Sequence, residues 1–302
     1  MRIALTGATG FIGRYIVNQL DSEGHSLRCW HRASSDRQGF ESIDKLTWVE
    51  GDLGDRQQAD RLVVDCDAVV HAALYRPGKG FMGAEGDLIE FIEKNVVGTL
   101  KLIEAARDAG VGRFVVVSTC AVHDKILTDR PLDETHPLWA ASHYGAHKAA
   151  IEKFVHSFGL GQDFPICAVR PTGVYGVNHP AEKSKWYDLI TKVVHGENVE
   201  CSRGGKEVHA ADVAKAISIL LTADGIKGEA FNCYDRYISE FEVATMAKEI
   251  SQSSSEIAGE SKLPKHQIVT DKIRSLGMEF GREALLRQTV TDLVESARSV
   301  QR

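Results

Sequence analysis

The feature that most constrains the fold is a glycine-rich turn near the start of the chain. Residues 2–6 (RIALT) have the pattern of a short apolar strand, residues 7–13 (GATGFIG) follow directly, and from Phe11 the apolar residues recur with helical spacing. A strand, a glycine-rich turn and a helix in succession form half of a dinucleotide-binding βαβ unit, although a glycine triplet alone also fits an ordinary turn. We expect the first glycine to permit the tight turn, the second to let the backbone approach a pyrophosphate, and the third to let the helix pack on the strand. The predicted phosphate site, at a helix N-terminus that offers unpaired N–H groups, comprises Gly7, Thr9, Gly10, Phe11, Ile12 and Gly13.

Composition limits the class of protein. With 302 residues, 43% of them apolar and 26% charged, the chain has room for one large α/β domain with a smaller lobe, or for two modest domains. A net charge of −6 gives no electrostatic reason to expect nucleic acid or an anionic membrane as a partner. Because no run of eighteen apolar residues exists and the N-terminal segment has the pattern of a core strand, we expect a cytoplasmic protein. The six cysteines form no CxxC pair, so we expect buried thiols and no metal site.

The segment after the second predicted strand bears on cofactor choice. That strand covers residues 27–30 and ends without an acidic residue, which would bind the ribose 2′-hydroxyl of NAD. Arg32, with Ser34 and Ser35 beside it, could instead hold a 2′-phosphate, so the sequence favours NADP and leaves NAD open. A solvated arginine in a loop is the alternative.

Two further strand ends are predicted to line the cofactor. A third strand at 46–49 leads into Asp52 and Leu53, which could contact the adenine, although the neighbouring Asp55 could simply cap a helix. A fourth, at 67–73, ends in Ala72 and Ala73, whose small side chains leave room for a cofactor or for a closely packed helix.

A tyrosine and a lysine one helical turn apart predict proton chemistry. Tyr144 and Lys148 open a helix that extends to about residue 158, so their side chains share one face. A nearby ammonium stabilises phenolate, and we therefore expect Lys148 to lower the pKa of Tyr144. A fifth strand, at 113–118, places the hydroxyls of Ser118 and Thr119 at the end of the sheet.

Several segments are predicted to surround the site. Residues 75–86 form a glycine-rich loop over its mouth, and the helix at about 87–109 is apolar almost all round, which predicts a homodimer through this helix and the one at 144–158. The serine-rich stretch 251–260 has the composition of a loop. Candidate contacts to a small-molecule substrate are Leu74, Tyr75, Cys120, Ala121, Gly173, His179 and Trp186.

Taken in order, these motifs resemble the extended short-chain dehydrogenase/reductase family, also called the NAD-dependent epimerase/dehydratase family. The matching segments are residues 6–13, Asp52-Leu53, residues 71–73, 95–99, Ser118-Thr119, 144–148, 170–176, 209–214 and 272–277. The resemblance implies that Tyr144 is the catalytic acid/base, that Lys148 holds the nicotinamide ribose, and that Thr119 binds the substrate oxygen. It further implies support from Ser118, an ordering role for Asn95, and cofactor contacts from Pro171, Thr172 and Val174.

Departures from the family pattern concern the substrate. Members that use nucleotide sugars typically carry an asparagine that contacts the diphosphate, and Gly173 stands at that position. They often place an arginine a few residues before the segment at 209–212, where this chain offers Lys206. The absence of both the asparagine and the arginine weakens the case for a substrate that carries a diphosphate, because each charge-assisted contact to phosphate is strong. Cys120 and Ala121 occupy the places of the Asp-Glu pair of sugar-nucleotide dehydratases, which argues against dehydration.

The sequence therefore predicts an α/β fold, with a doubly wound parallel Rossmann sheet and a small C-terminal α/β substrate lobe. Residues 1–170, completed by about 207–234, are assigned to the Rossmann domain, and 171–206 with 235–302 to the interleaved lobe. The resemblance implies an NAD(P)-dependent oxidoreductase that reduces a carbonyl or oxidises a secondary alcohol of a small polar or sugar-like substrate. A nucleotide-sugar 4-epimerase with the same Tyr144–Lys148 pair is the first alternative, and a non-catalytic NADP-binding redox sensor is the second.

Overall fold

A computed structural model describes residues 1–78, 83 and 85–299, which form two compact units. The first unit contains the described residues up to 171, together with 213–233 and 268–278. The second contains 172–212, 234–267 and the described residues from 279 onward. Residues 79–82 and 84, within the loop predicted at 75–86, lie outside the described residues.

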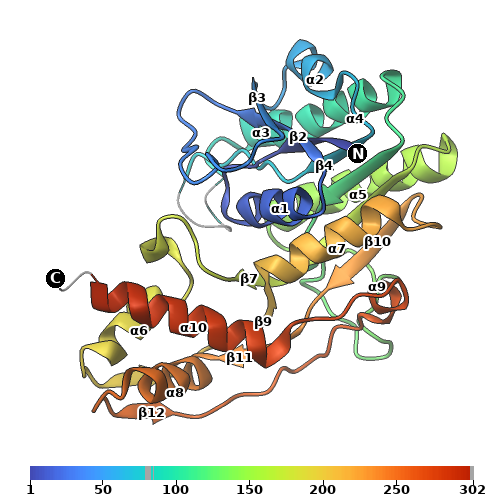
Figure 1. The fold of residues 1–302 in the computed structure, drawn as a ribbon. Helices are drawn as coiled ribbons and strands as arrows, with labels where there is room; N and C mark the ends of the chain where they lie inside the picture. The colour runs from blue at the N-terminus through green and yellow to red at the C-terminus, as the bar shows by residue number, and fades with distance from the viewer. Residues whose placement is uncertain (79–82, 84, 300–302) are drawn as a thin grey trace. The chain divides into compact units, whose positions relative to one another are not determined.

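A parallel sheet forms the centre of the first unit (Figure 1). Within the described residues it has seven strands in the order β10-β6-β5-β4-β1-β2-β3. The strands are β1 Arg2–Thr6, β2 Ser26–His31, β3 Leu46–Glu50, β4 Ala68–His71, β5 Arg113–Val117, β6 Ile166–Pro171 and β10 Glu229–Cys233. The order reverses between β1 and β4, where doubly wound sheets bind ligands beyond the carboxyl ends of the strands. The predicted Rossmann sheet is confirmed.

Burial on both faces explains why the central strands are apolar throughout. All four residues of β4 are buried, as are the last four of β5. A parallel sheet is covered by helices on both faces, so its strands need continuous apolar runs instead of alternating ones.

Helices cover both faces of this sheet. Their bounds are α1 Phe11–Ser22, α2 Arg56–Val63, α3 Leu88–Ile92, α4 Gly98–Asp108, α5 His143–Gly161, α7 Ala210–Thr222 and α9 Asp271–Ser275, with a π-helix at Glu93–Val97 and a 3₁₀ turn at Cys120–Val122. Side chains of α2, α4 and α5 pack with β4 and β5 in one hydrophobic core. Helices α1 and α7 lie in front of the sheet in Figure 1, and Ser218 of α7 donates to the Glu23 carboxylate at 2.7 Å.

The second unit has its own core between short strands and three longer helices. Its strands are β7 Gly173–Tyr175, β8 Val199–Cys201, β9 Gly204–His209, β11 Arg236–Ser239 and β12 Ile257–Gly259, and its helices are α6 Tyr187–Val194, α8 Glu240–Ser251, α10 Arg282–Ser299 and a 3₁₀ turn at Ala181–Lys183. Strand β9 lies between β7 and β11, and β12 pairs with β8. Apolar side chains of α6, α8 and α10 form the core.

The boundaries between the units differ from the predicted ones in two segments. Residues 207–212 fall in the second unit because β9 pairs with β7 and β11. Residues 268–278 fall in the first, where Ile268 forms a bridge with Leu132 and the Val269 carbonyl accepts a hydrogen bond from Asn232. The serine-rich stretch predicted as a loop contains β12, which is a correction: a three-residue strand leaves no periodic signal.

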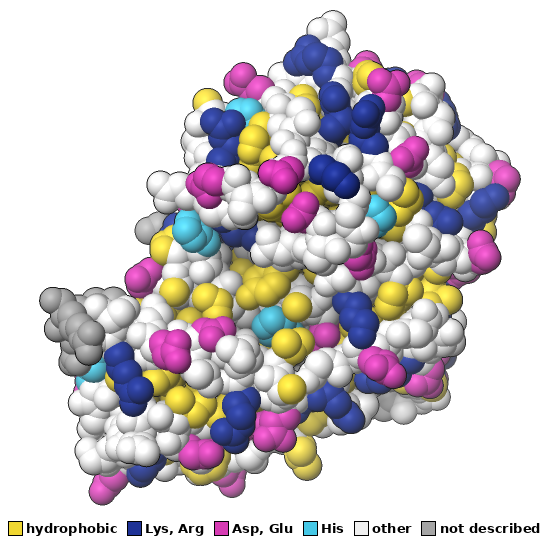
Figure 2. Space-filling view, in the orientation of Figure 1, with side chains coloured by type: hydrophobic (Ala, Val, Ile, Leu, Met, Phe, Trp, Pro, Cys, Tyr) yellow, Lys and Arg dark blue, Asp and Glu magenta, His cyan; other side chains and the backbone are white. Residues whose placement is uncertain are grey.

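The surface carries charges of both signs, and the cysteine side chains are thiols. On the face in Figure 2, Lys and Arg side chains are interspersed with Asp and Glu. All six cysteines are free thiols, and five are buried. Among the described residues, no helix combines the length and the apolar character needed to span a membrane.

Candidate active site

The glycine-rich turn between β1 and α1 is a backbone cradle with no room for side chains. Gly7 has φ +79°, and a Cβ there would lie 2.7 Å from the backbone of Ala72 and Ala73. A Cβ on Gly13 would lie 1.9 Å from the Gly7 carbonyl oxygen, so helix and turn touch there. Helix α1 begins after Gly10, which has no capping side chain, and its first N–H groups therefore remain suited to an anion. These residues fit the pyrophosphate of a dinucleotide.

A buried hydrogen-bonded chain fixes the ends of β1 and β4. Thr99 Oγ1 donates to the Asn95 carbonyl at 2.5 Å and so accepts from His71 Nε2 at 2.8 Å. His71 Nδ1 then accepts from Thr6 Oγ1 at 2.7 Å, and Thr6 Oγ1 in turn accepts from the Ala73 N–H at 3.2 Å. Burial lowers the pKa of His71 to about 3, so the imidazole stays neutral and the chain keeps this polarity.

Asn95 holds the loop that follows β4. Its Oδ1 accepts from the Tyr75 N–H at 2.8 Å, and its Nδ2 donates to the carbonyls of Tyr75 and Phe91, each at 2.9 Å. Asn95 belongs to the π-helix between α3 and α4, and its side chain is buried. These three hydrogen bonds are to backbone groups, so Asn95 orders the loop beside the site.

The other predicted cofactor residues lie where the parallel strands end. Arg32 is exposed after β2, and its N–H donates to Ser35 Oγ at 2.9 Å, which closes a turn. After β3, Asp52 Oδ1 accepts from the Leu53 N–H at 2.9 Å and its Oδ2 lies 3.4 Å from Lys94 Nζ. Pro171 ends β6, whereas Thr172 and Val174 belong to the second unit.

Helix α5 carries Tyr144 and Lys148. It starts at the cap formed by Ser142, whose Oγ accepts from the Gly145 N–H at 3.0 Å. The Thr119 side chain hydrogen-bonds the Tyr144 phenol, and Lys148 Nζ donates to the Val117 carbonyl at 2.8 Å. The end of β5 and the first turn of α5 therefore bring Thr119, Tyr144 and Lys148 together.

The pKa of Tyr144 differs from the expectation. Burial raises it above its ordinary value, and the hydrogen bond from Thr119 and the charge of Arg76 oppose that rise. The Lys148 ammonium, which we expected to lower this pKa, donates to the Val117 carbonyl. Burial lowers the pKa of Lys148 to about 8, against an opposing effect of Glu152. Arg76, one residue beyond Tyr75, was not among the predicted site residues.

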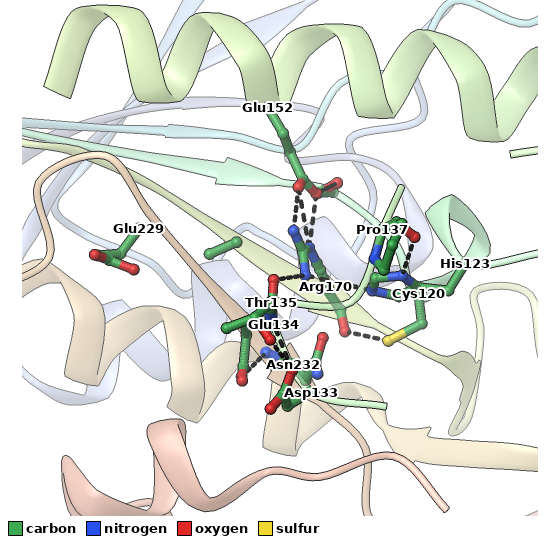
Figure 3. Close-up of polar contacts among 12 residues, drawn as sticks. Cys120, His123, Asp133, Glu134, Thr135, Pro137, Glu152, Arg170, Glu229 and Asn232 are labelled. Carbon is green, nitrogen blue, oxygen red and sulfur yellow. Dashed lines mark hydrogen bonds and ion pairs between the residues drawn. The ribbon is translucent and has the colours of Figure 1, made fainter. Parts of the chain in front are cut away.

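Ser118 faces the interior. Its Oγ donates to the buried Glu152 carboxylate, which also pairs with Arg170 (Figure 3). Cys120 Sγ donates to the Arg170 carbonyl at 3.0 Å, and burial raises the pKa of Cys120 to about 12. Ser118 therefore supports the site from behind, and the thiol of Cys120 stays protonated at neutral pH.

The predicted substrate contacts fall into two groups. Leu74, Tyr75, Cys120 and Ala121 belong to the first unit, and Gly173, His179 and Trp186 to the second. Trp186 has φ +67° and precedes α6, with its ring 5.3 Å from that of Tyr175. Trp186 thus packs against the core of its own unit.

A buried carboxylate occupies the space beside Gly173. Gly173 of β7 pairs with Glu207 of β9, and a Cβ on Gly173 would lie 2.6 Å from the Glu207 carboxylate. The Glu207 side chain is 3% exposed, and its Oε1 lies 2.5 Å from Lys185 Nζ. Burial raises the pKa of Glu207, and Lys185 opposes the rise. Sequence reasoning missed this carboxylate, because only the register of two strands places it beside residue 173.

The chain is similar to known proteins in sequence and in fold. Residues 3–233 match the NAD dependent epimerase/dehydratase family. The dTDP-D-glucose 4,6-dehydratase of Mus musculus is 28% identical over 306 residues, which cover 91% of this chain and 83% of that protein. A 4-hydroxy-2-methyl-3-oxo-4-farnesyl-3,4-dihydroquinoline-1-oxide ketoreductase of Stigmatella aurantiaca is 30% identical over 264 residues, 77% of this chain and 76% of the relative. The structure of a UDP-glucose 4-epimerase from Stenotrophomonas maltophila, with bound NAD and formylated UDP-arabinopyranose, matches with a TM-score of 0.82 at 21% identity, over 100% of this chain and 99% of that chain. At that identity the structural match supports the fold alone.

Proposed function

The chain belongs to the NAD dependent epimerase/dehydratase family, and we propose that it acts as a sugar 4-epimerase of the nucleotide-sugar type. Membership confirms the resemblance and the prediction that the chain is an enzyme. The relatives fit the epimerase alternative as well as, or better than, the predicted small-substrate reductase. In this reaction one secondary alcohol carbon is oxidised and then reduced from its other face.

The arrangement of Thr119, Tyr144 and Lys148 is the observation that carries the proposal. Thr119 and Tyr144 are hydrogen-bonded, so both hydroxyls can bind one substrate oxygen. Tyr144 would take the proton from the substrate hydroxyl as a phenolate during oxidation, and the resulting phenol would return that proton during reduction. Lys148 would hold the ribose hydroxyls. Bound NAD would supply the acceptor and donor of hydride.

Among the chemistries of the relatives, dehydration fits least. Elimination needs acid and base groups beside the oxidised carbon. The resemblance puts Cys120 and Ala121 at those positions, and the Cys120 thiol is held protonated with its hydrogen directed to the Arg170 carbonyl. Neither residue offers a carboxyl group.

NAD is the cofactor that fits this proposal. An epimerase returns the hydride it removes and therefore needs no exchange of cofactor. The preference for NADP rests on Arg32, which is exposed in a turn closed by Ser35, and the comparisons do not support it. We therefore place NAD first and keep NADP as the alternative that a titration decides.

One observation favours a second candidate, a reductase of a substrate without a diphosphate. The Glu207 carboxylate lies beside Gly173, the position at which the resemblance expects an asparagine that contacts diphosphate. A buried carboxylate would repel a diphosphate, although its ion pair with Lys185 reduces that repulsion. The ketoreductase relative fits this candidate. The Thr119–Tyr144–Lys148 group argues against the third possibility, a non-catalytic sensor, since a sensor needs no proton-handling group.

Turnover without added cofactor tests the proposal. UDP-glucose and dTDP-glucose are incubated with the purified protein, and the sugar 4-position is followed by proton NMR. We expect the 4-epimer to form with no cofactor added. Consumption of a carbonyl substrate only when NADH or NADPH is supplied would replace the epimerase with the reductase.

A further inference from the structure

A buried ion pair lies behind the group formed by Thr119, Tyr144 and Lys148. Glu152 of α5 and Arg170 of β6 have side chains 1% and 2% exposed. Arg170 Nη2 lies 2.6 Å from Glu152 Oε2, and its Nε lies 3.0 Å from both carboxylate oxygens. This is a forked pair with several charge-assisted hydrogen bonds.

The remaining N–H groups of Arg170 hold the chain between β5 and α5. Its Nη1 donates to the Glu134 carbonyl and to His123 Nε2, each at 3.3 Å (Figure 3). His123 Nδ1 can then donate to the Pro137 carbonyl at 3.3 Å, and burial, with Arg170, lowers the pKa of His123 to about 4. Arg170 thus joins β6 to the 123–137 segment as well as to α5.

The ion pair is also connected, through Ser118, to the groups of the proposed active site. Glu152 accepts from Ser118, whose neighbour in the chain is Thr119. Glu152 follows Lys148 by four residues, so the carboxylate and the ammonium share one face of α5. A buried ion pair is weak evidence for stability, because apolar residues of similar volume often serve as well. Stability therefore does not explain why this ion pair lies next to the group formed by Thr119, Tyr144 and Lys148.

We propose that Glu152 and Arg170 are positioning residues: Glu152 holds the Ser118 side chain next to Thr119 and is the counter-charge of Lys148, and Arg170 holds the Glu152 carboxylate in place. The catalytic meaning of this inference rests on the proposed function, whereas the experiment that tests it needs no activity. Neither residue touches the reacting atoms.

The charges around Lys148 support this assignment. Lys148 is faced by His71 from β4 and by Tyr144, His147 and Glu152 from its own helix. Burial lowers the pKa of each imidazole to about 3, and it raises that of Tyr144, so all three groups are neutral at pH 7. The Glu152 carboxylate is therefore the charge in this set that favours protonated Lys148.

Lysine NMR measures that effect without any substrate. The protein is labelled with ¹³C-lysine, the Lys148 Cε signal is assigned with Lys148→Met, and its midpoint is followed from pH 6 to 10 in wild type and Glu152→Gln. Glutamine keeps an acceptor for Ser118 but removes the charge. We expect the midpoint to fall by about one pH unit, as a neighbouring charge is removed.

Two comparisons separate this role from a structural one. Glu229→Gln removes a carboxylate from the Lys272 ion pair on β10 and should leave the Lys148 midpoint unchanged. If Glu152→Gln does not fold, Glu152→Met/Arg170→Met removes both charges at similar volume and is titrated instead. A folded variant with the wild-type midpoint would overturn the proposal. Absence of epimerase activity in the wild type would defeat the proposed function but leave this result standing.

Discussion

At the scale of single residues, the protonation state of Tyr144 sets the direction of its chemistry. Burial raises the pKa of Tyr144, so the resting phenol carries a proton at neutral pH. A protonated phenol is ready to donate to a carbonyl oxygen, whereas the oxidation step begins from the phenolate. Thr119, which hydrogen-bonds the phenol, is placed to orient it.

Replacing Tyr144 with phenylalanine should separate chemistry from binding. We expect turnover to fall by about 10²–10⁴-fold, because the proton donor is lost while the ring remains. The dissociation constant for NAD should change little. Steady-state kinetics and calorimetry measure the two effects, and Tyr237→Phe, in the second unit, is the matched control. Activity retained by Tyr144→Phe would remove Tyr144 from its role.

A methyl group on Gly13 should disrupt the cofactor cradle. Its Cβ would lie 1.9 Å from the Gly7 carbonyl, so helix α1 must shift. We expect Gly13→Ala to lose NAD affinity and about 1–3 kcal/mol of unfolding free energy, which is typical of overpacking. Urea denaturation and calorimetry test this. Gly161→Ala is the control, because a Cβ there meets nothing within 4 Å; equal losses in both variants would contradict the assignment.

At the scale of elements, the helical segment at 88–108 keeps apolar side chains exposed. Ile89 is 67% exposed and Val97 is 41% exposed, and Phe154 of α5 is 37% exposed. Exposed apolar side chains on neighbouring helices are typical of a subunit interface. The homodimer predicted from the sequence stays a prediction.

Light scattering tests the dimer. We expect twice the chain mass at micromolar concentration, and a monomer for Ile89→Asp/Val97→Asp, because two desolvated carboxylates oppose association. Leu263→Asp changes a residue that is 88% exposed outside these helices and should leave the mass unchanged. A wild-type monomer would contradict the prediction.

The elements also show what a sequence can reveal. Continuous apolar runs such as 114–117 and the glycine turn at 7–13 carry local signals, so the parallel sheet and the cradle are predictable. Tyr144 and Lys148 are recognisable because helical spacing puts them on one face. The Glu152–Arg170 pair joins residues 18 positions apart in different elements, and Glu207 meets Gly173 through strand register. Tertiary structure alone creates such pairs.

At the scale of the whole molecule, buried histidines should make the protein sensitive to acid. Burial lowers the pKa of His71 and His147 to about 3, and of His123 and His209 to about 4. As pH falls from about 6.5 to about 4, the unfolded chain takes up protons that the folded protein does not. Stability is therefore lost over this window.

Urea denaturation at several pH values measures the effect. Each histidine should contribute a slope of about 1.4 kcal/mol per pH unit in this range. His147→Leu should reduce the slope of unfolding free energy against pH by about one proton, because it removes a histidine that burial keeps neutral in the fold. The same substitution at the exposed His195 is the control. Parallel curves for wild type and His147→Leu would show that His147 is not held neutral by the fold.

The nucleotide carried by the purified protein shows whether the cofactor is retained and recycled. Acid releases any bound dinucleotide, and chromatography with mass spectrometry identifies and counts it. An epimerase that recycles its hydride should retain close to one NAD per chain, oxidised and reduced forms together. A protein that carries no nucleotide and binds neither NAD nor NADP in calorimetry would contradict the account.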